Sequence, residues 1–278
     1  MQFGKVTIVG VGLIGGSIGL GLKERGLAQE VVGVGRRKIS LEKALECGAI
    51  ETATMDLAEG CQGAEIVILA VRVSLIARMA RRAMPHLAPG TIITDVASTK
   101  AVIVKDIEGF LKEDVHFIGG HPLAGSEKRG VEFARGDLFE GARTILTPTQ
   151  RTSEAALKKI STLWRSLGAK VSLLSPEEHD HILAFVSHLP HLVAMALVDA
   201  VPEEALSFAA AGFKDTTRIA ASDPEIWQDI FLANKEEVLK ALKRFREDLE
   251  QKEKCLKDAD QKRLLSLLKS VREKRETL

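Results

Sequence analysis

Residues 5–15 read KVTIVGVGLIG, and this stretch decides the fold. Its first six residues form a short apolar run rich in β-branched side chains, which is typical of a buried strand. The run leads into the pattern G-x-G-x-x-G, and helix-like sequence extends from residue 14 to residue 25. Because the pattern closes a strand and opens a helix, it predicts the turn of a dinucleotide-binding Rossmann unit.

The three glycines of the pattern have separate physical roles. Gly10 permits the tight turn, Gly12 lets the backbone approach a pyrophosphate, and Gly15 lets the helix pack closely on the strand. The helix N-terminus adds unpaired N–H groups and a positive dipole end, both of which favour phosphate. A glycine-rich turn that binds nothing is the alternative, but the strands that follow favour a cofactor site. The expected cofactor contacts are Gly10, Gly12, Leu13, Ile14, Gly15, Arg36 and Val71.

Short apolar strands alternate with helical segments through the first half of the chain. The expected strands cover residues 5–10, 31–35, 65–71, 91–98, 115–120, 143–149 and 169–175. This alternation predicts an α/β N-terminal Rossmann domain, with a parallel sheet and helices on both of its faces.

Beyond residue 174 the sequence is almost wholly helical. Ser175, Pro176 and Glu178 predict a helix start, with an N-cap serine, a proline at the first position and a capping-box glutamate. Residues 182–198 are apolar nearly all round, which indicates a helix buried in a core or a subunit interface. Pro190 should kink this helix.

The change of pattern predicts a domain boundary near residue 173. We expect a Rossmann domain over residues 1–173 and an all-α domain, for substrate binding and dimerisation, over residues 174–278. Apolar residues at four-three spacing predict further amphipathic helices near the C-terminus. Helical segments with such apolar faces favour self-association, so we expect a homodimer.

Composition narrows the class of protein. Lys and Arg number 39 and Asp and Glu 38, so no basic field indicates nucleic acid or a membrane surface as a partner. No uninterrupted apolar run reaches the roughly 18 residues of a membrane span, and no secretory signal pattern opens the chain. The three cysteines are widely spaced and form no CxxC pair, which favours a reducing cytoplasm.

Residues 117–130 read FIGGHPLAGSEKRG and place a histidine on a stiff mount at the end of a predicted strand. Ser98 also follows a predicted strand, so His121 and Ser98 should reach the crevice where a dinucleotide accepts a hydride. A histidine with a pKa near neutral can take the proton of an alcohol as the hydride leaves its carbon. Ser98 could hydrogen-bond to that histidine or to the same hydroxyl. A purely structural hydrogen-bonding role for His121 is the alternative.

A second polar cluster lies in residues 212–227, GFKDTTRIAASDPEIW. Arg218 could grip a carboxylate with a bidentate pair of hydrogen bonds, and Asp215 and Trp227 belong to the same stretch. A solvated helix face is the alternative.

Two histidines stand three residues apart in the sequence SHLPH. On a helix, His188 and His191 could form half of a metal site, but no third and fourth ligands stand at metal-site spacing. We therefore expect no metal and expect one of the two histidines to face the active-site cleft.

The residue after the second predicted strand bears on the choice of dinucleotide. An acidic residue there would grip the ribose 2′-hydroxyl of NAD, but this sequence has Gly35 followed by Arg36 and Arg37. An arginine can pair with a 2′-phosphate or stack on adenine, which leans toward NADP and leaves NAD open. Ordinary solvated charges are an equal alternative.

Five motifs occur in order along the chain: GVGLIGGSIGLGL, TDVASTK, GGHPLAGSEKRG, SHLPH and GFKDTTRIAASDPEIW. Together they resemble the prephenate dehydrogenase family, with cyclohexadienyl and arogenate dehydrogenases as close relatives. The resemblance runs from residue 3 to roughly residue 250. It implies an oxidative decarboxylation in which prephenate and NAD(P)+ give 4-hydroxyphenylpyruvate, CO2 and NAD(P)H, in tyrosine biosynthesis. It also implies a Rossmann domain followed by a helical domain that forms a homodimer.

The resemblance also implies roles for single residues. His121 matches the histidine that deprotonates the substrate 4-hydroxyl, Ser98 the serine that helps to orient it, and Arg218 the arginine that binds a substrate carboxylate. The further pocket residues that it implies are Ser126, Glu127, His191, Asp215 and Trp227.

Several alternatives stay open at this point. Prephenate and arogenate differ only in a side-chain keto group or ammonium, so the sequence does not separate them. A Rossmann dehydrogenase of the β-hydroxyacid or imine reductase type is a second possibility, but it would not explain GGHPLAGSEKRG. A non-catalytic dinucleotide-sensing dimer is a third, and the intact Ser98, His121 and Arg218 argue against it.

Overall fold

The computed structural model describes residues 2–125 and 128–277. The chain forms two compact units, Met1–Asn234 and Lys235–Leu278. The first unit holds the sheet together with most of the helices of the second half. This division reflects compactness alone, so the change of architecture near residue 173 stays a prediction as a domain boundary.

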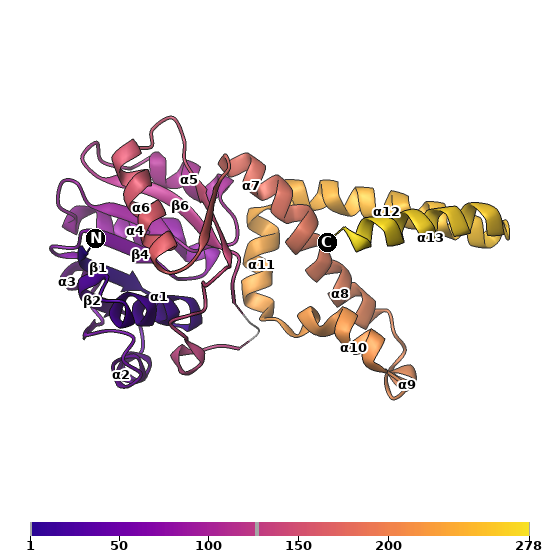
Figure 1. Cartoon of the computed structure of the whole chain (residues 1–278), viewed down its shortest axis with the longest axis horizontal. Coiled ribbons are helices and arrows are strands. Elements are labelled where there is room, and N and C mark those ends of the chain that lie inside the picture. Colours follow the sequence, from indigo (N-terminus) through magenta and orange to yellow (C-terminus); the bar gives the residue numbers. More distant parts are fainter. Residues whose placement is uncertain (1, 126–127, 278) are drawn as a thin grey trace. The chain divides into compact units, whose positions relative to one another are not determined.

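The first unit is built around one eight-stranded sheet (Figure 1). Its strands are β1 (Phe3–Val9), β2 (Ala28–Val34), β3 (Thr52–Thr54), β4 (Ile66–Leu69), β5 (Ile92–Asp95), β6 (His116–Pro122), β7 (Arg143–Thr147) and β8 (Lys170–Leu173). They lie in the order β3-β2-β1-β4-β5-β6-β7-β8, and every neighbouring pair is parallel except β6 with β7. The predicted α/β Rossmann fold is confirmed. The prediction missed β3, because its three residues, TAT, contain no apolar run.

Side chains of the central strands alternate between two buried faces. In β4, Ile66 and Ile68 belong to one core cluster, whereas Val67 and Leu69 belong to the other. The first face is covered by α1 (Leu13–Glu24), α2 (Lys38–Glu46) and α6 (Glu154–Ser166). The second is covered by α3 (Leu57–Cys61), α4 (Val73–Ala83) and α5 (Ala101–Glu108). Because both faces are buried, these strands are apolar throughout, which is why they could be predicted as short continuous runs.

The first unit continues beyond the sheet as helices. These are α7 (Pro176–Leu183), α8 (Leu189–Asp199), α9 (Glu203–Leu206), α10 (Ala211–Thr217) and α11 (Pro224–Ala233), and short 3-10 turns cover Met84–His86, Val131–Phe133 and Arg218–Ala221. The predicted capping box is confirmed, because the Ser175 hydroxyl accepts the Glu178 N–H and the Glu178 carboxylate accepts the Ser175 N–H.

The irregularity predicted at Pro190 lies one turn earlier. Residues Ala184–His188 form a π-helical turn between α7 and α8. Pro190 has no N–H to donate to the carbonyl of Val186, which lies inside that turn, so the helix widens there instead of forming regular α-helical bonds.

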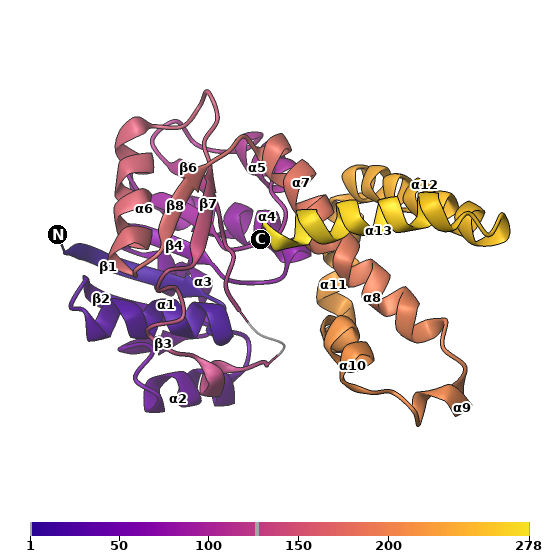
Figure 2. The ribbon, with the colours of Figure 1, turned by 45° about the vertical axis from the view of Figure 1, so that its right-hand side comes forward.

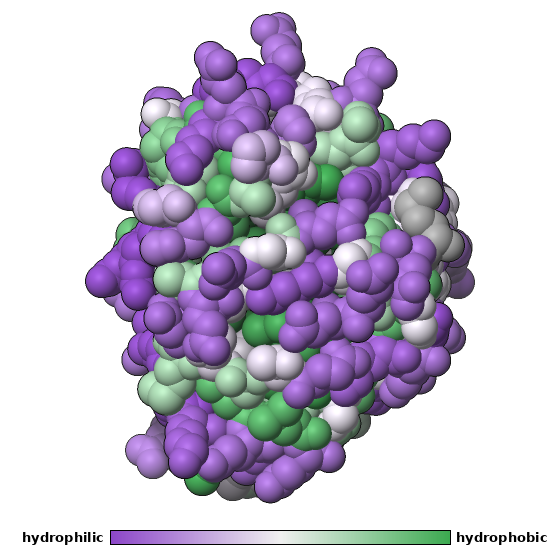
Figure 3. All heavy atoms as spheres, turned by 90° about the vertical axis from the view of Figure 1, so that its left-hand side faces the viewer, coloured by the Kyte–Doolittle hydropathy of each residue, from purple (hydrophilic) through white to green (hydrophobic). Residues whose placement is uncertain are grey.

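The stretch Pro176–Asp199 is long and apolar enough to cross a membrane by length and composition, although no uninterrupted apolar run predicted a span. Only 22% of its most apolar window is buried within this chain. Its exposed apolar side chains include Ile182, Phe185, Val186 and Leu197. The face of the molecule in Figure 3 is different, since hydrophilic side chains predominate there and the apolar ones form small patches. One such helix is weak evidence for a membrane, because a helix that packs against a partner subunit passes the same test.

The second unit is a helical hairpin. Its helices, α12 (Lys235–Lys257) and α13 (Gln261–Glu276), pack along each other (Figure 2). At the turn between them Ala259 has a φ of 49°, and the Asp260 side chain caps α13 by accepting the Arg263 N–H. The amphipathic helices predicted near the C-terminus are therefore confirmed.

Candidate active site

The strand order reverses between β1 and β4, and ligands of such sheets bind beyond the carboxyl ends of the strands at that point. The glycine turn follows β1 at this edge, and Ala70 and Val71 follow β4. The two loops lie against each other, since a Cβ on Gly10 would meet the Ala70 carbonyl and the Val71 side chain. The structure thus brings the predicted turn residues and Val71 together at the switch point.

The glycine turn has the geometry of a phosphate cradle. Gly10 has a φ of 98°, and a Cβ on Gly15 would collide with the Gly10 carbonyl oxygen, so both positions require glycine. A Cβ on Gly12 would meet nothing within 4 Å, so open space lies over the start of α1. No side chain caps that helix start, where Leu13 and Ile14 are half-buried. The residues present therefore fit a dinucleotide.

Arg36 lies just beyond β2. It is exposed, as is Arg37, whereas Gly35 is half-buried close to Leu41. Arg36 is therefore free of any core packing role.

His121 and Ser98 lie at the carboxyl ends of the adjacent parallel strands β6 and β5. His121 is buried and pairs in register with Ile145 of β7, and Ser98 is half-buried on the bend after β5. In the described part of the chain no hydrogen bond joins Ser98 to His121. The ring of His121 pairs instead with His179, with a distance of 2.8 Å between His121 Nδ1 and His179 Nε2.

A hydrogen-bonded chain continues from His121 into α7. His179 Nδ1 lies 2.8 Å from Asp180 Oδ1. The Asp180 carboxylate also accepts the backbone N–H groups of Lys100, at 2.7 Å, and Ala101, at 2.9 Å. The His121, His179 and Asp180 side chains are all buried. The chain thus connects the start of α5 to the imidazole at the end of β6.

A buried ion pair supports the same corner of the site. Lys100 Nζ pairs with the Asp95 carboxylate, and both side chains are fully buried. Asp95 also accepts the backbone N–H groups of Ala97 and Gly120, each at 3.0 Å. The bond to Gly120 fixes the residue that precedes His121 and so fixes the strand end that carries the imidazole.

Burial keeps the imidazoles of this corner neutral. It lowers the pKa of His121 well below its usual value, and the neighbouring His179 and Lys100 lower it further. Burial also lowers the pKa of His179, against the hydrogen bond to Asp180. At neutral pH His121 is therefore an unprotonated imidazole, which is the form that a general base needs.

The second predicted cluster gathers around Trp227 of α11. His191 of α8 is stacked on its indole, with ring centroids 3.5 Å apart. Burial lowers the pKa of His191, the hydrogen bond to Ser187 opposes this shift, and the charge of Arg218 adds to it. The guanidinium of Arg218 therefore acts on the His191 ring, while Asp215 is exposed on α10. His191, Trp227 and Arg218 form one group.

The other histidine of SHLPH has a different environment. His188 is fully buried, and its Nδ1 accepts the Asn234 amide N–H at 3.1 Å. Asn234 also donates to the backbone carbonyl of Asp180, at 2.8 Å. Burial lowers the pKa of His188 to about 4. Of the two histidines, His191 is the one whose pKa the charge of Arg218 lowers.

The predicted pocket residues Ser126 and Glu127 lie outside the described residues. Polar pairs tie the neighbouring elements to α11, the helix of Trp227: Arg129–Asp223, Arg72–Glu225 and Ser74–Asp229. These pairs hold α11 beside the loop after β6 and the start of α4.

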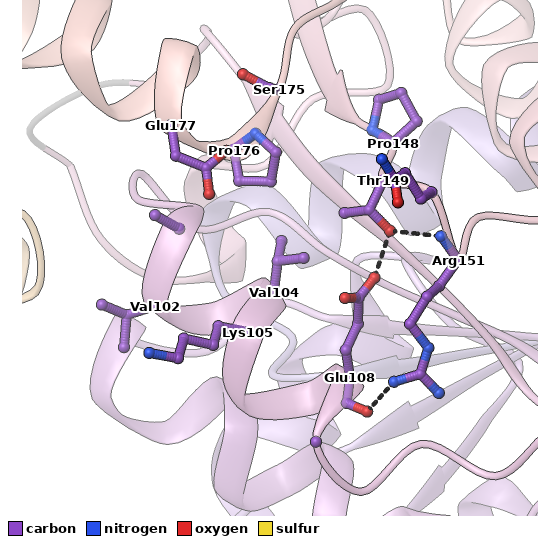
Figure 4. A pocket seen from close by; sticks show the side chains of 13 residues that line it. Val102, Val104, Lys105, Glu108, Pro148, Thr149, Arg151, Ser175, Pro176 and Glu177 are labelled. Atoms are coloured by element: carbon purple, nitrogen blue, oxygen red, sulfur yellow. Dashed lines mark hydrogen bonds between the residues drawn. The ribbon is translucent and has the colours of Figure 1, made fainter.

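The described part of the first unit also has a pocket away from the predicted site residues and a hollow at Trp227. An open pocket of about 980 Å³ lies between α5, residues 148–151 and the start of α7 (Figure 4). Its Glu108 carboxylate accepts the Thr149 hydroxyl at 2.5 Å, and Arg151 donates to the Glu108 carbonyl at 2.5 Å. Its described lining contains none of the predicted site residues. A smaller apolar hollow of about 380 Å³ is lined in part by Trp227.

Four residues of this site were not predicted from the sequence: Asp95, Lys100, His179 and Asp180. A weak signal existed, because Asp95 is a carboxylate inside the apolar strand predicted over residues 91–98 and the adjacent pair at 179–180 can ionise. Their joint placement depends on α7 packing against α5, which no local pattern shows.

Comparisons with known proteins agree with this geometry. The model of the prephenate dehydrogenase nucleotide-binding domain matches residues 18–173, and that of the prephenate dehydrogenase dimerization domain matches residues 175–270. The prephenate dehydrogenase of Bacillus subtilis is 34% identical over 283 residues, which cover 98% of this chain and 76% of that protein. The cyclohexadienyl dehydrogenase of Zymomonas mobilis is 31% identical over 280 residues, which cover 98% of this chain and 95% of that protein.

A solved structure of a prephenate dehydrogenase is also similar to this chain. The crystal structure of prephenate dehydrogenase from A. aeolicus, in complex with hydroxyphenyl propionate and NAD+, has a TM-score of 0.93 and 37% identity and covers 100% of this chain and 98% of that chain. Since the two family models span most of the chain and relatives above 30% identity span nearly all of it, the chain belongs to the prephenate dehydrogenase family.

Proposed function

We propose that this protein catalyses the oxidative decarboxylation of prephenate to 4-hydroxyphenylpyruvate and CO2, with hydride transfer to NAD(P)+. The observation that carries the proposal is His121, a buried neutral imidazole at the carboxyl end of β6, near the switch point of a Rossmann sheet. Membership of the prephenate dehydrogenase family supports it.

The glycine turn is the proposed site for the dinucleotide. Gly12 and the uncapped start of α1 would hold the pyrophosphate, with Gly10, Leu13, Ile14, Gly15 and Val71 around it. When bound, the cofactor supplies the acceptor for the hydride.

His121 is the proposed general base. Its neutral ring would take the proton of the substrate 4-hydroxyl, and the half-buried Ser98 would orient that hydroxyl. Positioned proton transfer of this kind contributes on the order of 10²–10⁴ in rate.

Arg218 is the proposed partner of a substrate carboxylate. The charge of its guanidinium lowers the pKa of His191, which is stacked on Trp227. The guanidinium would bind a substrate carboxylate, and the indole would contact the apolar ring of the substrate. Asp215, Ser126 and Glu127 are further candidate pocket residues, proposed by family resemblance alone.

One observation favours a second substrate, arogenate. His191 Nδ1 donates to the Ser187 carbonyl at 2.9 Å, so in the neutral ring Nε2 is an acceptor. An ammonium can donate to that atom, whereas a keto oxygen cannot. The Zymomonas mobilis relative, a cyclohexadienyl dehydrogenase, supports this candidate.

Three further properties are proposed: the oligomeric state, the cellular location and the cofactor preference. The matched dimerization domain supports a homodimer through the helical half. We propose a cytoplasmic location, because Cys47, Cys61 and Cys255 are free thiols. We propose that the exposed Arg36 would meet a 2′-phosphate, which leans toward NADP.

Absorbance at 340 nm tests the proposal in four assays of the purified protein: prephenate or arogenate, each with NAD+ or NADP+. Turnover of prephenate is the expected result, and the ratio of the two cofactors shows whether Arg36 reads the 2′-phosphate. Turnover of arogenate alone would show that arogenate, and not prephenate, is the substrate. No turnover in any assay, with cofactor still bound, would refute the proposed function.

A further inference from the structure

The hydrogen-bonded chain behind His121 fixes which nitrogens carry protons. Asp180 accepts two backbone N–H groups, at 2.7 and 2.9 Å, so it serves as a carboxylate with acceptors only. His179 Nδ1, 2.8 Å from this carboxylate, must therefore carry a proton and donate it. In the neutral ring of His179 the other nitrogen, Nε2, then holds a lone pair.

The same argument extends to His121. Its Nδ1 lies 2.8 Å from the lone pair of His179 Nε2, so His121 Nδ1 must be the donor. In the neutral ring the lone pair is then on Nε2. This is the nitrogen left to accept a proton from a substrate, so the tautomer suits a general base.

We propose that His179 and Asp180 are positioning residues for proton transfer at His121: they hold its Nδ1–H tautomer and share the positive charge that its ring acquires. The inference rests on the proposed function, in which His121 takes the proton of the substrate 4-hydroxyl. It extends the site to two buried residues of α7 that do not contact the substrate.

The fate of the substrate proton shows what the hydrogen-bonded residues His121, His179 and Asp180 contribute to the reaction. The substrate O–H bond breaks, its proton bonds to His121 Nε2, and its electron pair forms the C4–O double bond as the hydride leaves C4. Loss of the ring carboxylate as CO2 returns an electron pair to the ring, and the phenolate oxygen takes the proton back from His121. The reaction neither releases nor consumes this proton, so the hydrogen-bonded residues His121, His179 and Asp180 only have to keep it until the phenolate takes it back.

Asp180 is the group that makes holding the proton favourable. A buried imidazolium without a partner is costly, and the nearby Lys100 is already paired with Asp95. When His121 is protonated at Nε2, its Nδ1 proton can pass to His179 Nε2, and the charge then lies beside the Asp180 carboxylate. If Asp180 served only to cap α5, it would affect neither the tautomer nor the rate of the chemical step.

The tautomer is measurable without substrate or cofactor. In protein labelled with 15N-histidine, long-range 1H–15N spectra at pH 7.5 distinguish Nδ1–H from Nε2–H rings. We expect Nδ1–H for both His121 and His179, assigned from the signals lost in His121→Asn and His179→Gln. An Nε2–H ring at His121 would overturn the proposal, whatever the enzyme turns over.

Two variants test the link to catalysis. In Asp180→Asn the amide cannot accept from all three donors, and it carries no negative charge to stabilise a protonated His179. We expect a kcat lower by about 10- to 10³-fold, with less than about a threefold change in KM for prephenate. His179→Gln keeps an acceptor toward His121 but cannot take a proton. We expect it to preserve the tautomer and lower kcat by about tenfold.

His181→Gln is the matched control, because His181 is exposed two residues further along the same helix. It should change neither the His121 tautomer nor kcat. If Asp180→Asn does not fold, the wild-type spectrum and His179→Gln still decide the proposal. Wild-type kcat in both variants would overturn it. If the wild-type enzyme turns over neither prephenate nor arogenate, the proposed function fails, while the spectra still decide the tautomer.

Discussion

The imidazole of His191 is stacked on the indole of Trp227, with centroids 3.5 Å apart and planes inclined by 21°. The ring is also held at one edge, because its Nδ1 donates to the Ser187 carbonyl one turn earlier in the helix, at 2.9 Å. Two contacts therefore fix the orientation of the ring, and Nε2 is the edge left for a ligand. This arrangement makes Trp227 a reporter of the protonation state of His191.

Trp227 fluorescence should titrate with His191. A protonated imidazole quenches a stacked indole more strongly than a neutral one, because it accepts an electron more readily. Burial and the charge of Arg218 lower the pKa of His191, so we expect the midpoint to lie below the ordinary histidine value of about 6.5. The measurement is emission against pH in Trp164→Phe, which removes the other of the two tryptophans.

Two further variants check this assignment. Arg218→Ala should raise the midpoint, and His191→Asn should remove the step. His188 lies 6.2 Å from Trp227 between ring centroids and has a pKa of about 4, so any lower step belongs to it. A midpoint that Arg218→Ala leaves in place would contradict the electrostatic coupling.

His121→Asn should lower kcat by on the order of 10²–10⁴, because the site loses its neutral base. Cofactor affinity should change little, since the glycine turn follows β1, whereas His121 lies on β6. Steady-state rates and cofactor titration measure the two effects. An unchanged kcat with saturating substrate would remove His121 from the chemical step.

Gly12→Ala separates cofactor binding from folding. The added methyl group meets no protein atom within 4 Å, so the thermal unfolding midpoint should stay near that of the wild type. The methyl group would occupy the space proposed for the pyrophosphate, and loss of one charge-assisted hydrogen bond would weaken cofactor binding by about tenfold or more. Calorimetric titration with NAD+ and NADP+ measures this loss.

Gly212→Ala is the matched control, since its Cβ also meets nothing within 4 Å and it lies on α10. Gly15→Ala should lower the unfolding midpoint, because its Cβ would collide with the Gly10 carbonyl. Equal cofactor affinity in Gly12→Ala and the wild type would rule out the proposed cradle.

Local sequence patterns predicted much of the scaffold. The glycine turn, the central strands and the capping box at Ser175 each depend on neighbours within a few residues, so their patterns were visible in the chain itself. The His121–His179 pair could not be found in this way, because its members are 58 residues apart and meet only after α7 packs on the sheet half.

Lys100 shows the same limit. In sequence it is an ordinary charged residue after TDVAST, and lysines are rarely fully buried. Its burial follows from Asp95, five residues earlier, which pairs with it and also accepts two backbone N–H groups. A buried charge of this kind depends on tertiary partners, which periodicity does not encode.

Arg218→Ala should raise KM for prephenate by about 10- to 100-fold, because a hydrogen bond to a charged group contributes about 1.5–3 kcal/mol. The carboxylate is bound in the ground state as well as in the transition state, so kcat should fall less than KM rises. Initial rates over a range of prephenate concentrations separate the two. An unchanged KM would exclude Arg218 as the carboxylate partner.

Stability should fall as the pH drops from about 7 toward 4, because four buried or half-buried histidines have lowered pKa values: His121, His179, His188 and His191. Above about pH 6.5 both the folded and the unfolded chain hold these rings neutral, so their contribution does not change. Below this pH the unfolded chain binds protons that the buried rings of the folded chain do not bind, so the free energy of unfolding decreases.

For His188 alone, with a folded pKa of about 4, this decrease in the free energy of unfolding reaches on the order of 3 kcal/mol. Urea unfolding at pH 7.5 and pH 5 measures this slope, at one fixed protein concentration because self-association makes the free energy of unfolding depend on concentration. His188→Gln should reduce the slope, whereas the exposed His86→Gln should not. Equal free energies at the two pH values would show that these rings are protonated as readily in the folded chain as in the unfolded one.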